Sequence, residues 1–441
     1  MKDALLGGEK KVCFWGLGYI GYSALVYYSH RGVKCVGYDL NEEVVANLRA
    51  GKSPSAGLET WLRMNGMSTE VRAEFTSSEQ EVADQAEQIS VFKLCIPTEE
   101  HGEVSARFLE ATCKTIAKML DGRTEPVLID VESTVSAWML DKIVAPAFEN
   151  VPGALISTSP RRDWFISSEK DLARLPRIVG GVTPEAGRAA AEVNSIVCHD
   201  VVLASGHREA AVTKAVENAL RNISINVVNQ LARDTELDVR EVCDLVATKW
   251  NVGRYNPSLG IGGYCIPLGP AYLVSGESPE KLGLLRAAVE QTQDYIDWVA
   301  GRIIEGGFKK VAFLGMAYRG DVPVYKGSPF VSIARSLARA GVEVVISDHY
   351  ASISDYEWMK TEPNMRACPY PHALLGAEMV VVGSWHGVYS QIGLEELFSQ
   401  LHGVKVVLDN EGAFAHVPAK WWETHGISYR RPGDKGWAVF R

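Results

Sequence analysis

The feature that most limits what this chain can fold into lies near its amino terminus. A short apolar run, Lys11 to Trp15, leads into the turn Gly16-Leu17-Gly18-Tyr19-Ile20-Gly21, a helical stretch to about His30, and a second apolar run that ends at Asp39. This order of strand, glycine turn, helix, strand and acid is typical of a dinucleotide-binding βαβ unit. The sequence therefore predicts a parallel, doubly wound sheet at the start of the chain.

The same unit indicates which dinucleotide it binds. Glycines in the turn allow a pyrophosphate to approach the helix amino terminus closely. An acidic side chain at the end of the second strand, here Asp39, hydrogen-bonds the ribose hydroxyls and repels a 2′-phosphate. We therefore expect NAD as the cofactor. The candidate cofactor-binding residues of this unit are Gly16, Gly18, Tyr19, Ile20, Gly21 and Asp39.

Polar residues follow two further predicted strands. The runs Ile89 to Ile96 and Pro126 to Val131 are followed by Thr98 and by Glu132-Ser133-Thr134. A doubly wound sheet presents its ligand edge beyond the carboxyl ends of its strands, so Thr98, Glu132 and Thr134 are candidates to face the nicotinamide. The same residue types also favour helix caps, and the spacing leaves both interpretations open. Leu155 to Ser159 and Pro176 to Gly181 read as later strands of this domain.

The middle of the chain carries the candidate nucleophile. From about Ala204 to Thr248 the apolar pattern is helical, and Lys214 and Asn218 lie one turn apart on one face. The stretch Gly260 to Pro267 then places Cys265 in a glycine-crowded loop. A thiol there attacks an aldehyde if its neighbours favour the thiolate. The alternatives are a solvated lysine and a buried structural cysteine.

A third segment begins near Ala300. Lys310 to Gly315 repeats the strand-then-glycine opening, and Val342 to Ser347 ends at Asp348 as the earlier second strand ends at Asp39, but there is no second GxGxxG. We expect an α/β protein with two Rossmann-like doubly wound domains joined by a central helical segment. The predicted parts are residues 1–203, 204–300 and 301–441.

Composition excludes several other classes. The chain has 441 residues and a formal net charge of −9, which argues against a broad nucleic-acid-binding surface. No apolar run approaches the roughly 18 residues of a membrane span, and Met1 to Lys11 lacks a signal-peptide core. The eight cysteines show no CxxC pair and no metal-ligand spacing. We therefore expect a cytoplasmic protein with reduced thiols, no metal, and no nucleic-acid or membrane partner.

Several short motifs follow one another along the chain. They are the glycine turn at 16–21, Ser53-Pro54-Ser55-Ala56-Gly57-Leu58, Cys95-Ile96-Pro97-Thr98, Glu132-Ser133-Thr134-Val135, Lys214-Ala215-Val216-Glu217-Asn218, Tyr255-Asn256-Pro257-Ser258, Gly262-Gly263-Tyr264-Cys265 and Gly315-Met316-Ala317-Tyr318-Arg319. In this order they resemble the motifs of the UDP-glucose and UDP-N-acetylmannosamine dehydrogenases. The resemblance covers the whole chain and implies an NAD-dependent enzyme that oxidises the primary alcohol of a nucleotide sugar to a carboxylate.

The resemblance also implies roles for individual side chains. Cys265 would capture the aldehyde as a thiohemiacetal, and a second hydride loss would give a thioester that water hydrolyses. Lys214 and Asn218 would stabilise the oxyanion or hold a water, and Thr134 would position a proton-carrying water. Lys326 matches an arginine that contacts NAD. The candidate substrate-binding residues are Arg161, Tyr255, Asn256, Ser258, Gly262 and Arg319, of which Arg319 matches a substrate-binding lysine.

The chain departs from the family at several of these positions. Gly269 replaces an aspartate four residues after the cysteine, and Arg161 replaces a glutamate implicated in hydrolysis. Two lost carboxylates and one added guanidinium make the pocket more positive, so we expect a changed substrate, a changed extent of oxidation, or both. The other departures are Ala137-Trp138 for a Pro-Gly pair, Val324-Tyr325 for an acidic pair, and Glu411 for an arginine of the sugar-nucleotide site.

Two hypotheses and two alternative functions follow. Arg161 pairs with an anionic group on the substrate, or hydrolysis is impaired so that the reaction stops at the aldehyde. The alternative functions are a diverged dehydrogenase acting on a different nucleotide or phosphorylated alcohol, and a catalytically degenerate binding protein. Family resemblance also implies a homodimer or larger homo-oligomer.

Overall fold

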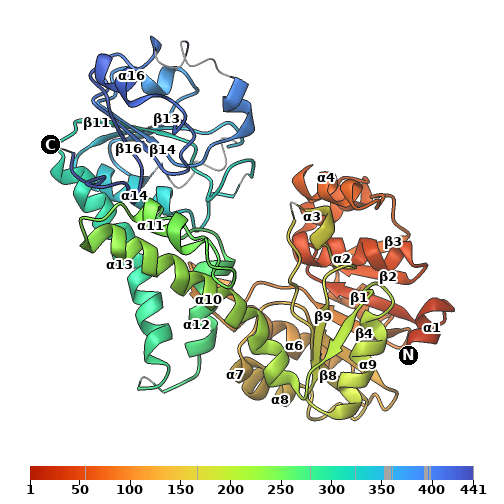
Figure 1. Cartoon of the computed structure of the whole chain (residues 1–441). Helices are drawn as coiled ribbons and strands as arrows, with labels where there is room; N and C mark the ends of the chain where they lie inside the picture. The colour runs from red at the N-terminus through yellow and green to blue at the C-terminus, as the bar shows by residue number, and fades with distance from the viewer. Residues whose placement is uncertain are drawn as a thin grey trace. The chain divides into compact units, whose positions relative to one another are not determined.

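The computed structural model describes residues 1–441 except 55, 166, 279, 323, 352–358, 360, 392–395, 397–398 and 441. The chain forms two compact units, and each contains its own sheet (Figure 1). Unit 1 consists of Met1–Glu217 and Ala271–Lys281, and unit 2 consists of Asn218–Pro270 and Leu282–Arg441. The chain passes between the units within α10 (His207–Asp234), within α12 (Cys265–Val274), and between Lys281 and Leu282.

Unit 1 is built on an eight-stranded sheet in the order β10-β9-β8-β7-β4-β1-β2-β3. Its six strands from β3 to β8 follow the order of a doubly wound nucleotide-binding sheet. Neighbouring strands are parallel except β8 and β9, which are antiparallel. The strands are β1 (Lys11–Trp15), β2 (Lys34–Tyr38), β3 (Ala73–Thr76), β4 (Ile89–Leu94), β7 (Val127–Val131), β8 (Ala154–Thr158), β9 (Arg177–Gly181) and β10 (Val201–Leu203), with β5 (Glu99–Glu100) and β6 (Glu103–Val104) forming a separate ribbon.

Helices α2 and α9 pack against the same apolar core of this sheet. Leu25 and Tyr28 of α2 and Val193 of α9 share a buried cluster with Phe14 of β1 and Leu128 of β7. This packing fixes the amino terminus of α2 beside the carboxyl end of β1. The helices of unit 1, besides part of α10 and α12, are α1 (Lys2–Leu6), α2 (Tyr19–His30), α3 (Glu42–Arg49), α4 (Ala56–Met64), α5 (Glu79–Ala83), α6 (Arg107–Met119), α7 (Ala137–Met139), the π-helical η1 (Leu140–Val144), α8 (Ala145–Ala147), the 3-10 turn η2 (Ser168–Lys170) and α9 (Pro184–Asn194).

Unit 2 contains a six-stranded parallel sheet in the order β13-β12-β11-β14-β15-β16, which repeats the doubly wound order. Its strands are β11 (Lys310–Leu314), β12 (Glu343–Ser347), β13 (Met365–Ala367), β14 (Met379–Val382), β15 (Val406–Asp409) and β16 (Ser428–Arg430). Its helices include α11 (Val239–Val246), α13 (Gly283–Glu305), α14 (Pro329–Arg339), η4 (His372–Leu374), η5 (Gly387–Gln391) and α16 (Ala419–Thr424).

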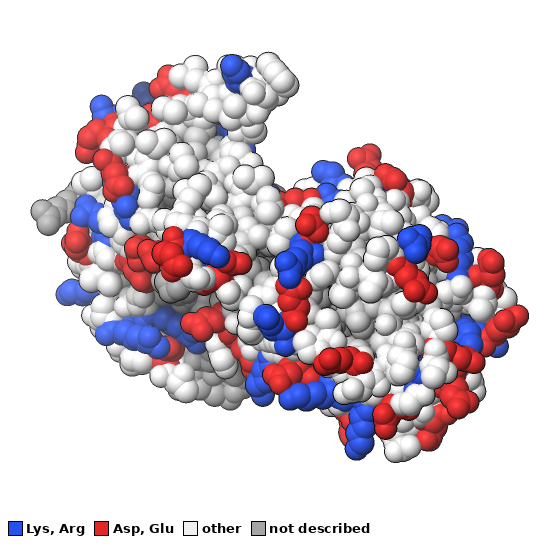
Figure 2. Space-filling view, turned by 90° about the horizontal axis from the view of Figure 1, so that it is seen from below, with Lys and Arg blue, Asp and Glu red and all other residues white. Residues whose placement is uncertain are grey.

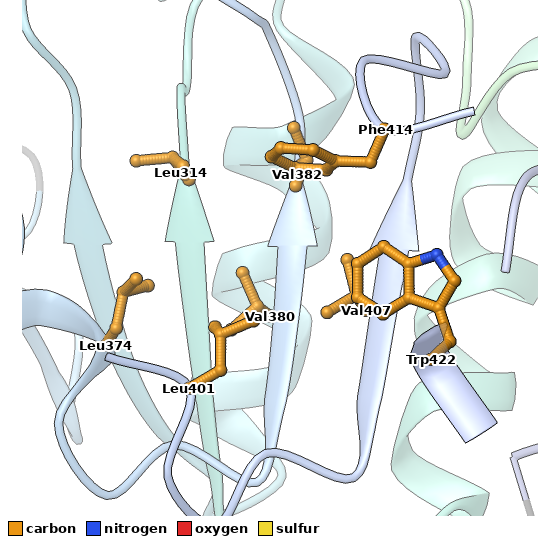
Figure 3. Close-up of a pocket in the computed structure, with 8 residues that line it drawn as sticks. All are labelled: Leu314, Leu374, Val380, Val382, Leu401, Val407, Phe414 and Trp422. Carbon is orange, nitrogen blue, oxygen red and sulfur yellow. The ribbon is translucent and has the colours of Figure 1, made fainter. Parts of the chain in front are cut away.

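Two apolar cores cover the two faces of the second sheet. One joins α13 and α14 to β11 and β12, and includes Ile296, Phe330 and Phe313. The other includes Phe414 and Trp422, and encloses a small void (Figure 3). Apolar side chains line this void, so it belongs to the core and offers no polar group to a ligand. Its lining residues are Leu314, Leu374, Val380, Val382, Leu401, Val407, Phe414 and Trp422.

The predicted fold class is confirmed, with two differences in detail. The predicted helical region from Ala204 to Thr248 is two helices, because the Asp238 side chain accepts a hydrogen bond from the Glu241 backbone and starts α11 anew. The edge strands β3, β10, β13 and β16 were not predicted. They are only three or four residues long, and β10 is partly exposed, so they lack a distinct apolar run. The three-part division at 203 and 300 stays a prediction.

Charges of both signs are interspersed on the face seen in Figure 2, without a continuous field of one sign. No helix in the described part of the chain is long and apolar enough to cross a membrane.

Candidate functional site

In the glycine turn after β1, two positions leave no room for a side chain. Gly16 has a φ of +94°, and a Cβ there would lie 2.5 Å from the Cys95 carbonyl oxygen. A Cβ on Gly21 would lie 1.8 Å from the Gly16 carbonyl oxygen. At Gly18, by contrast, a Cβ would meet nothing within 4 Å, and this residue precedes the first turn of α2 without a side-chain cap. The open backbone and the helix amino terminus suit an anionic pyrophosphate.

Asp39 lies beside this turn, as predicted. One carboxylate oxygen accepts a hydrogen bond from the Leu17 backbone at 2.7 Å, and the other accepts one from the Asn41 backbone at 2.9 Å. Each oxygen keeps a further lone pair, and the side chain is half-buried. Asp39 therefore braces the turn while remaining accessible to a ribose.

The equivalent acid of the second sheet has a different environment. Asp348 also accepts a hydrogen bond from the turn after the first strand, at Met316. Its side chain is buried, and its carboxylate additionally accepts hydrogen bonds from the Tyr325 hydroxyl at 2.9 Å and from His386 Nε2 at 3.0 Å. His386 Nδ1 accepts the Asp321 backbone N–H, so Nε2 carries the proton. The Asp348 carboxylate thus accepts hydrogen bonds from more protein donors than the Asp39 carboxylate, which leaves Asp39 with more capacity to bind a ribose.

The ends of β4 and β7 bring Thr98, Glu132 and Thr134 together. Thr98 Oγ1 donates to the Thr134 carbonyl at 2.7 Å, and Ser133 Oγ donates to the Ile96 carbonyl at 2.6 Å. Thr98 and Glu132 are buried, whereas Thr134 is half-buried. Among the described residues, the Thr134 hydroxyl makes no hydrogen bond. These residues join two strand ends instead of capping helices, and the Thr134 hydroxyl remains available for chemistry.

Beneath these strand ends lies a buried charge cluster, which consists of Lys93, Asp130, Glu132, Arg161, Asp163 and Arg177. Lys93 Nζ lies 2.7 Å from Asp130 and 3.0 Å from Glu132, and Arg177 lies 3.1 Å from Glu132. Arg161 pairs with Asp163 and lies 3.5 Å from Glu132. Three cations thus balance three anions in the interior, as the burial of charge requires.

The cluster keeps its acids ionised. Burial alone would raise the pKa of Glu132, but Lys93, Arg177 and Arg161 outweigh it and lower that pKa to about 2. Burial alone would also raise the pKa of Asp163, but the Arg161 guanidinium outweighs burial and lowers that pKa. These carboxylates are therefore poor proton acceptors near neutral pH.

Arg161 does not face a substrate in this arrangement. The residue is 2% exposed, and its guanidinium also donates to the Ile20 carbonyl and the Ser23 hydroxyl, both at 3.0 Å. Its donors are thus directed at protein acceptors in the interior. The geometry favours a structural role for Arg161 over the predicted contact with a substrate anion, and Glu132, 1% exposed, is likewise enclosed.

The first part of α10 is tied to the loop that carries Arg161. The neighbouring Arg162 donates through Nε to Glu217 at 3.1 Å and through a terminal nitrogen to the Pro176 carbonyl at 2.8 Å. Lys214 lies less than one turn before Glu217 on the same helix and is half-buried. Asn218 follows on the same helix, within unit 2. The predicted lysine therefore belongs to unit 1 and the predicted asparagine to unit 2.

In unit 2, the loop before Cys265 is held by close backbone packing. A Cβ on Gly260 would lie 2.7 Å from both Ile296 and Pro329, and one on Gly262 would lie 2.9 Å from the Tyr318 Cβ. The Leu259 backbone donates to Asn410 Oδ1 at 2.8 Å. These contacts fix the loop against α13 and α14, and explain why it is rich in glycine.

Cys265 is the first residue of α12, and its side chain is exposed. The seven other cysteines are buried or half-buried, and all eight are free thiols. A helix amino terminus favours negative charge, so this position suits the oxyanion that forms when the thiol adds to a carbonyl carbon. The Cys265 thiol is therefore accessible to a ligand, whereas the alternative interpretation, a structural cysteine, required it to be buried.

Some of the other predicted residues of unit 2 lie next to the loop before Cys265, and the rest lie on the segment that precedes it. Gly262 packs beside Tyr318, the neighbour of the half-buried Arg319. Lys326 is exposed, and its Nζ lies 5.5 Å above the ring of Tyr264. The remaining predicted residues lie on the preceding segment: Tyr255 and Ser258 are half-buried, whereas Asn256 is exposed and accepts a hydrogen bond from Arg254.

One of the predicted departures from the resembled family, Gly269, has a structural cause. A Cβ on Gly269 would lie 2.6 Å from the Asn218 Cβ and 2.7 Å from the Ala219 nitrogen. Helix α12 approaches α10 so closely there that no aspartate fits. Glu411 accepts a hydrogen bond from the Trp385 backbone, and burial raises its pKa.

Three family models match the chain. They are the NAD-binding domain (residues 10–197), the central domain (residues 208–294) and the UDP-binding domain (residues 312–416) of the UDP-glucose/GDP-mannose dehydrogenase family. The chain belongs to this family. It is an NAD-dependent nucleotide-sugar dehydrogenase, as predicted, and the open backbone at Gly18 and the accessible Asp39 lie within the NAD-binding match.

Relatives of known name are distant but extend over most of the chain. UDP-N-acetyl-D-mannosamine dehydrogenase of Methanococcus aeolicus is 25% identical and covers 97% of each chain. NDP-N-acetyl-D-galactosaminuronic acid dehydrogenase of Ralstonia solanacearum is also 25% identical, over 91% of this chain and 95% of the relative. The solved UDP-D-ManNAc dehydrogenase of Pyrococcus horikoshii matches with a TM-score of 0.79 at 22% identity, over 98% of this chain and 100% of that one, which shows the same fold.

The sequence reasoning missed the buried charge cluster as a unit. Its signal was present: Lys93 and Asp130 are charged residues inside two apolar runs, and they are register partners on the neighbouring strands β4 and β7. Tyr272 of α12 was also missed, since a tyrosine in an apolar helix carries no pattern of its own.

Proposed function

We propose that this dehydrogenase oxidises the primary alcohol of a UDP-linked hexose or 2-acetamidohexose to a carboxylate. The observation that carries the proposal is the exposed thiol of Cys265 at the first residue of α12, in a glycine loop that packing holds in place. The names of both relatives support a nucleotide-linked 2-acetamido sugar as the substrate class, and the name of the Methanococcus aeolicus relative supports UDP as the nucleotide. A binding protein has no need of such a thiol.

The proposed chemistry uses this chain's residues as follows. The alcohol first loses a hydride and a proton to give an aldehyde. The Cys265 thiolate then adds to the aldehyde carbon, and protonation of the oxygen gives a thiohemiacetal. Loss of a second hydride and a proton gives a thioester, and water attacks it to release the acid and restore the thiol. Lys214 and Asn218 stabilise the oxyanion formed at the addition and hydrolysis steps, and Thr134 positions a water through its hydroxyl, which has no hydrogen-bond partner among the described residues.

Bound NAD would accept the hydride in each oxidation. The open backbone at Gly18 and the amino terminus of α2 fit its pyrophosphate, and Asp39 fits a ribose. We propose that Tyr19, Ile20, Thr98 and Lys326 complete the cofactor site. The proposed substrate residues are Tyr255, Asn256, Ser258, Gly262 and Arg319.

The carboxylates of this chain favour a second possible outcome, in which thioester hydrolysis is impaired. Gly269 leaves no room for a carboxylate, and Glu132 and Asp163 are paired inside the buried charge cluster. These acids therefore do not supply a base for thioester hydrolysis. An enzyme that stops at the aldehyde, or releases the acid slowly, is the alternative that follows.

The test is NADH formation by the purified protein with UDP-, GDP-, dTDP- and CMP-sugars, with Cys265→Ser alongside. We expect turnover with UDP-linked sugars, and loss of acid formation in the Cys265→Ser variant. Intact NAD binding without NADH from any nucleotide sugar would contradict the proposal, and would favour another phosphorylated alcohol or a binding role.

We also propose that the enzyme is a cytoplasmic homo-oligomer. Eight free cysteines suit a reducing compartment. Helix α10 exposes an apolar stripe at Val216, Leu220 and Val227, which are 40%, 62% and 50% exposed and lie on one face. A second copy of the chain would cover this stripe. Sedimentation at the mass of a single chain would contradict this assembly.

A further inference from the structure

Tyr272 connects α12 to the ends of β4 and β7. It lies seven residues after Cys265 on the same helix and is 6% exposed. Its hydroxyl lies 2.7 Å from Thr98 Oγ1 and 3.1 Å from the Thr98 carbonyl. Thr98 Oγ1 in turn lies 2.7 Å from the Thr134 carbonyl. A chain of hydrogen bonds therefore joins Tyr272 to Thr134 through Thr98.

The direction of these bonds follows from proton counting. A threonine hydroxyl has one proton, and Thr98 gives it to the Thr134 carbonyl, which has no proton to offer. Tyr272 must therefore be the donor toward Thr98. Its proton is directed at Thr98 Oγ1 and at the Thr98 carbonyl, so it fixes both the rotamer of Thr98 and the strand end behind it. Without Tyr272, the Thr98 hydroxyl is free to turn away from Thr134.

A second contact holds the same segments together. Gly276, four residues after Tyr272, has a φ of +81°, and a Cβ there would lie 2.3 Å from Cγ of Trp138. Trp138 follows Thr134 by four residues. The segment at 272–276 thus approaches the segment at 134–138 at two points, one polar through Thr98 and one apolar. Both segments belong to unit 1.

We infer that Tyr272 is a positioning residue for Thr134. It holds the Thr134 backbone through Thr98 and so orients the Thr134 hydroxyl, which makes no hydrogen bond of its own among the described residues. The inference rests on the proposed function, in which Thr134 positions a water. Tyr272 touches neither water nor substrate in this role, since its hydroxyl is directed at Thr98.

The test compares Tyr272→Phe with Tyr28→Phe. Both variants remove one hydroxyl from a buried tyrosine of unit 1, and the Tyr28 hydroxyl donates to the Val193 carbonyl, away from Thr98 and Thr134. We expect Tyr272→Phe to lower kcat about tenfold with KM changed less than about twofold, because a misplaced catalytic group slows the chemical step more than it weakens binding. Tyr28→Phe leaves kcat near the wild-type value.

Two variants of Thr98 complete the design. Thr98→Val removes the link itself, so the double variant with Tyr272→Phe is no slower than Thr98→Val alone. Thr98→Ser keeps the hydroxyl and so keeps the link, and in this background Tyr272→Phe still lowers kcat by a similar factor. Equal effects of Tyr272→Phe and Tyr28→Phe on kcat would overturn the inference, and so would strictly additive effects of Tyr272→Phe and Thr98→Val.

Hydrogen exchange of the backbone separates this inference from the proposed function. Residues 132–136 exchange faster in Tyr272→Phe than in wild type or Tyr28→Phe, whether or not a substrate has been found. Unchanged exchange in this segment would overturn the positioning role. An absence of turnover by the wild type, with faster exchange in Tyr272→Phe, would instead contradict the proposed function alone.

Discussion

Six ionisable side chains lie enclosed in unit 1 with their charges balanced, and Arg161 contacts two of the three acids. Charge is tolerated in the interior only when it is paired and hydrogen-bonded. The serine hydroxyls of Ser157 and Ser159 and the amide of Asn194 complete the bonds of Asp130. At the residue scale, the arginine that replaces a family glutamate is therefore part of a structural network.

Arg161→Glu tests this assignment. The change adds a fourth carboxylate and leaves Glu132 and Asp163 with fewer cations, so we expect it to lower the free energy of unfolding by at least about 3 kcal/mol. Chemical denaturation of the purified variant measures this. Arg63→Ala is the control, because Arg63 is 70% exposed and its pair with Glu59 contributes less than about 0.5 kcal/mol. A stable Arg161→Glu variant with altered substrate preference would return Arg161 to the predicted substrate role.

At the scale of elements, the close approach of α12 to α10 excludes a side chain at position 269, four residues after Cys265. The backbone of Gly269 lies against Asn218 and Ala219 without space for a side chain. Asn218 is a proposed oxyanion ligand, and Gly269 follows Cys265 by one helical turn. A close helix–helix contact thus stands where the resemblance to the family implies a carboxylate.

Gly269→Ala measures the tightness of this contact. An added methyl group overpacks the interface and costs about 1–3 kcal/mol in stability. Gly301→Ala is the matched control, because it lies inside α13 with nothing within 4 Å of its Cβ and is expected to stabilise by up to about 1 kcal/mol. Thermal unfolding measures the change in stability of both variants. Equal stabilisation by the two changes would show that α12 has room for a side chain at this position.

At the scale of the whole molecule, the sequence predicts the two sheets but only part of the site. Gly16, Gly18, Asp39 and Cys265 are predicted because each meets a local demand, such as a positive φ, a strand end or a glycine loop. The structural role of Arg161 was not predictable in this way. It depends on partners in α2 and after β7, and no local pattern brings these two segments to the loop that carries Arg161.

The contact between Gly269 and Asn218 has the same origin. The two residues are 51 positions apart in the chain, and only the packing of two helices makes the glycine necessary. Tyr272 and Thr98 are likewise joined across the fold. The parts of the site that depend on tertiary contact are those the sequence leaves open.

The central claim is that Cys265 carries a four-electron oxidation of a nucleotide sugar. The measurement that tests it most directly is the number of NADH molecules formed for each sugar consumed at complete conversion, for wild type and Cys265→Ser. The account predicts a ratio of two for the wild type and a loss of the acid product in the variant. A ratio of one, with aldehyde as the product and no effect of Cys265→Ser, would contradict it.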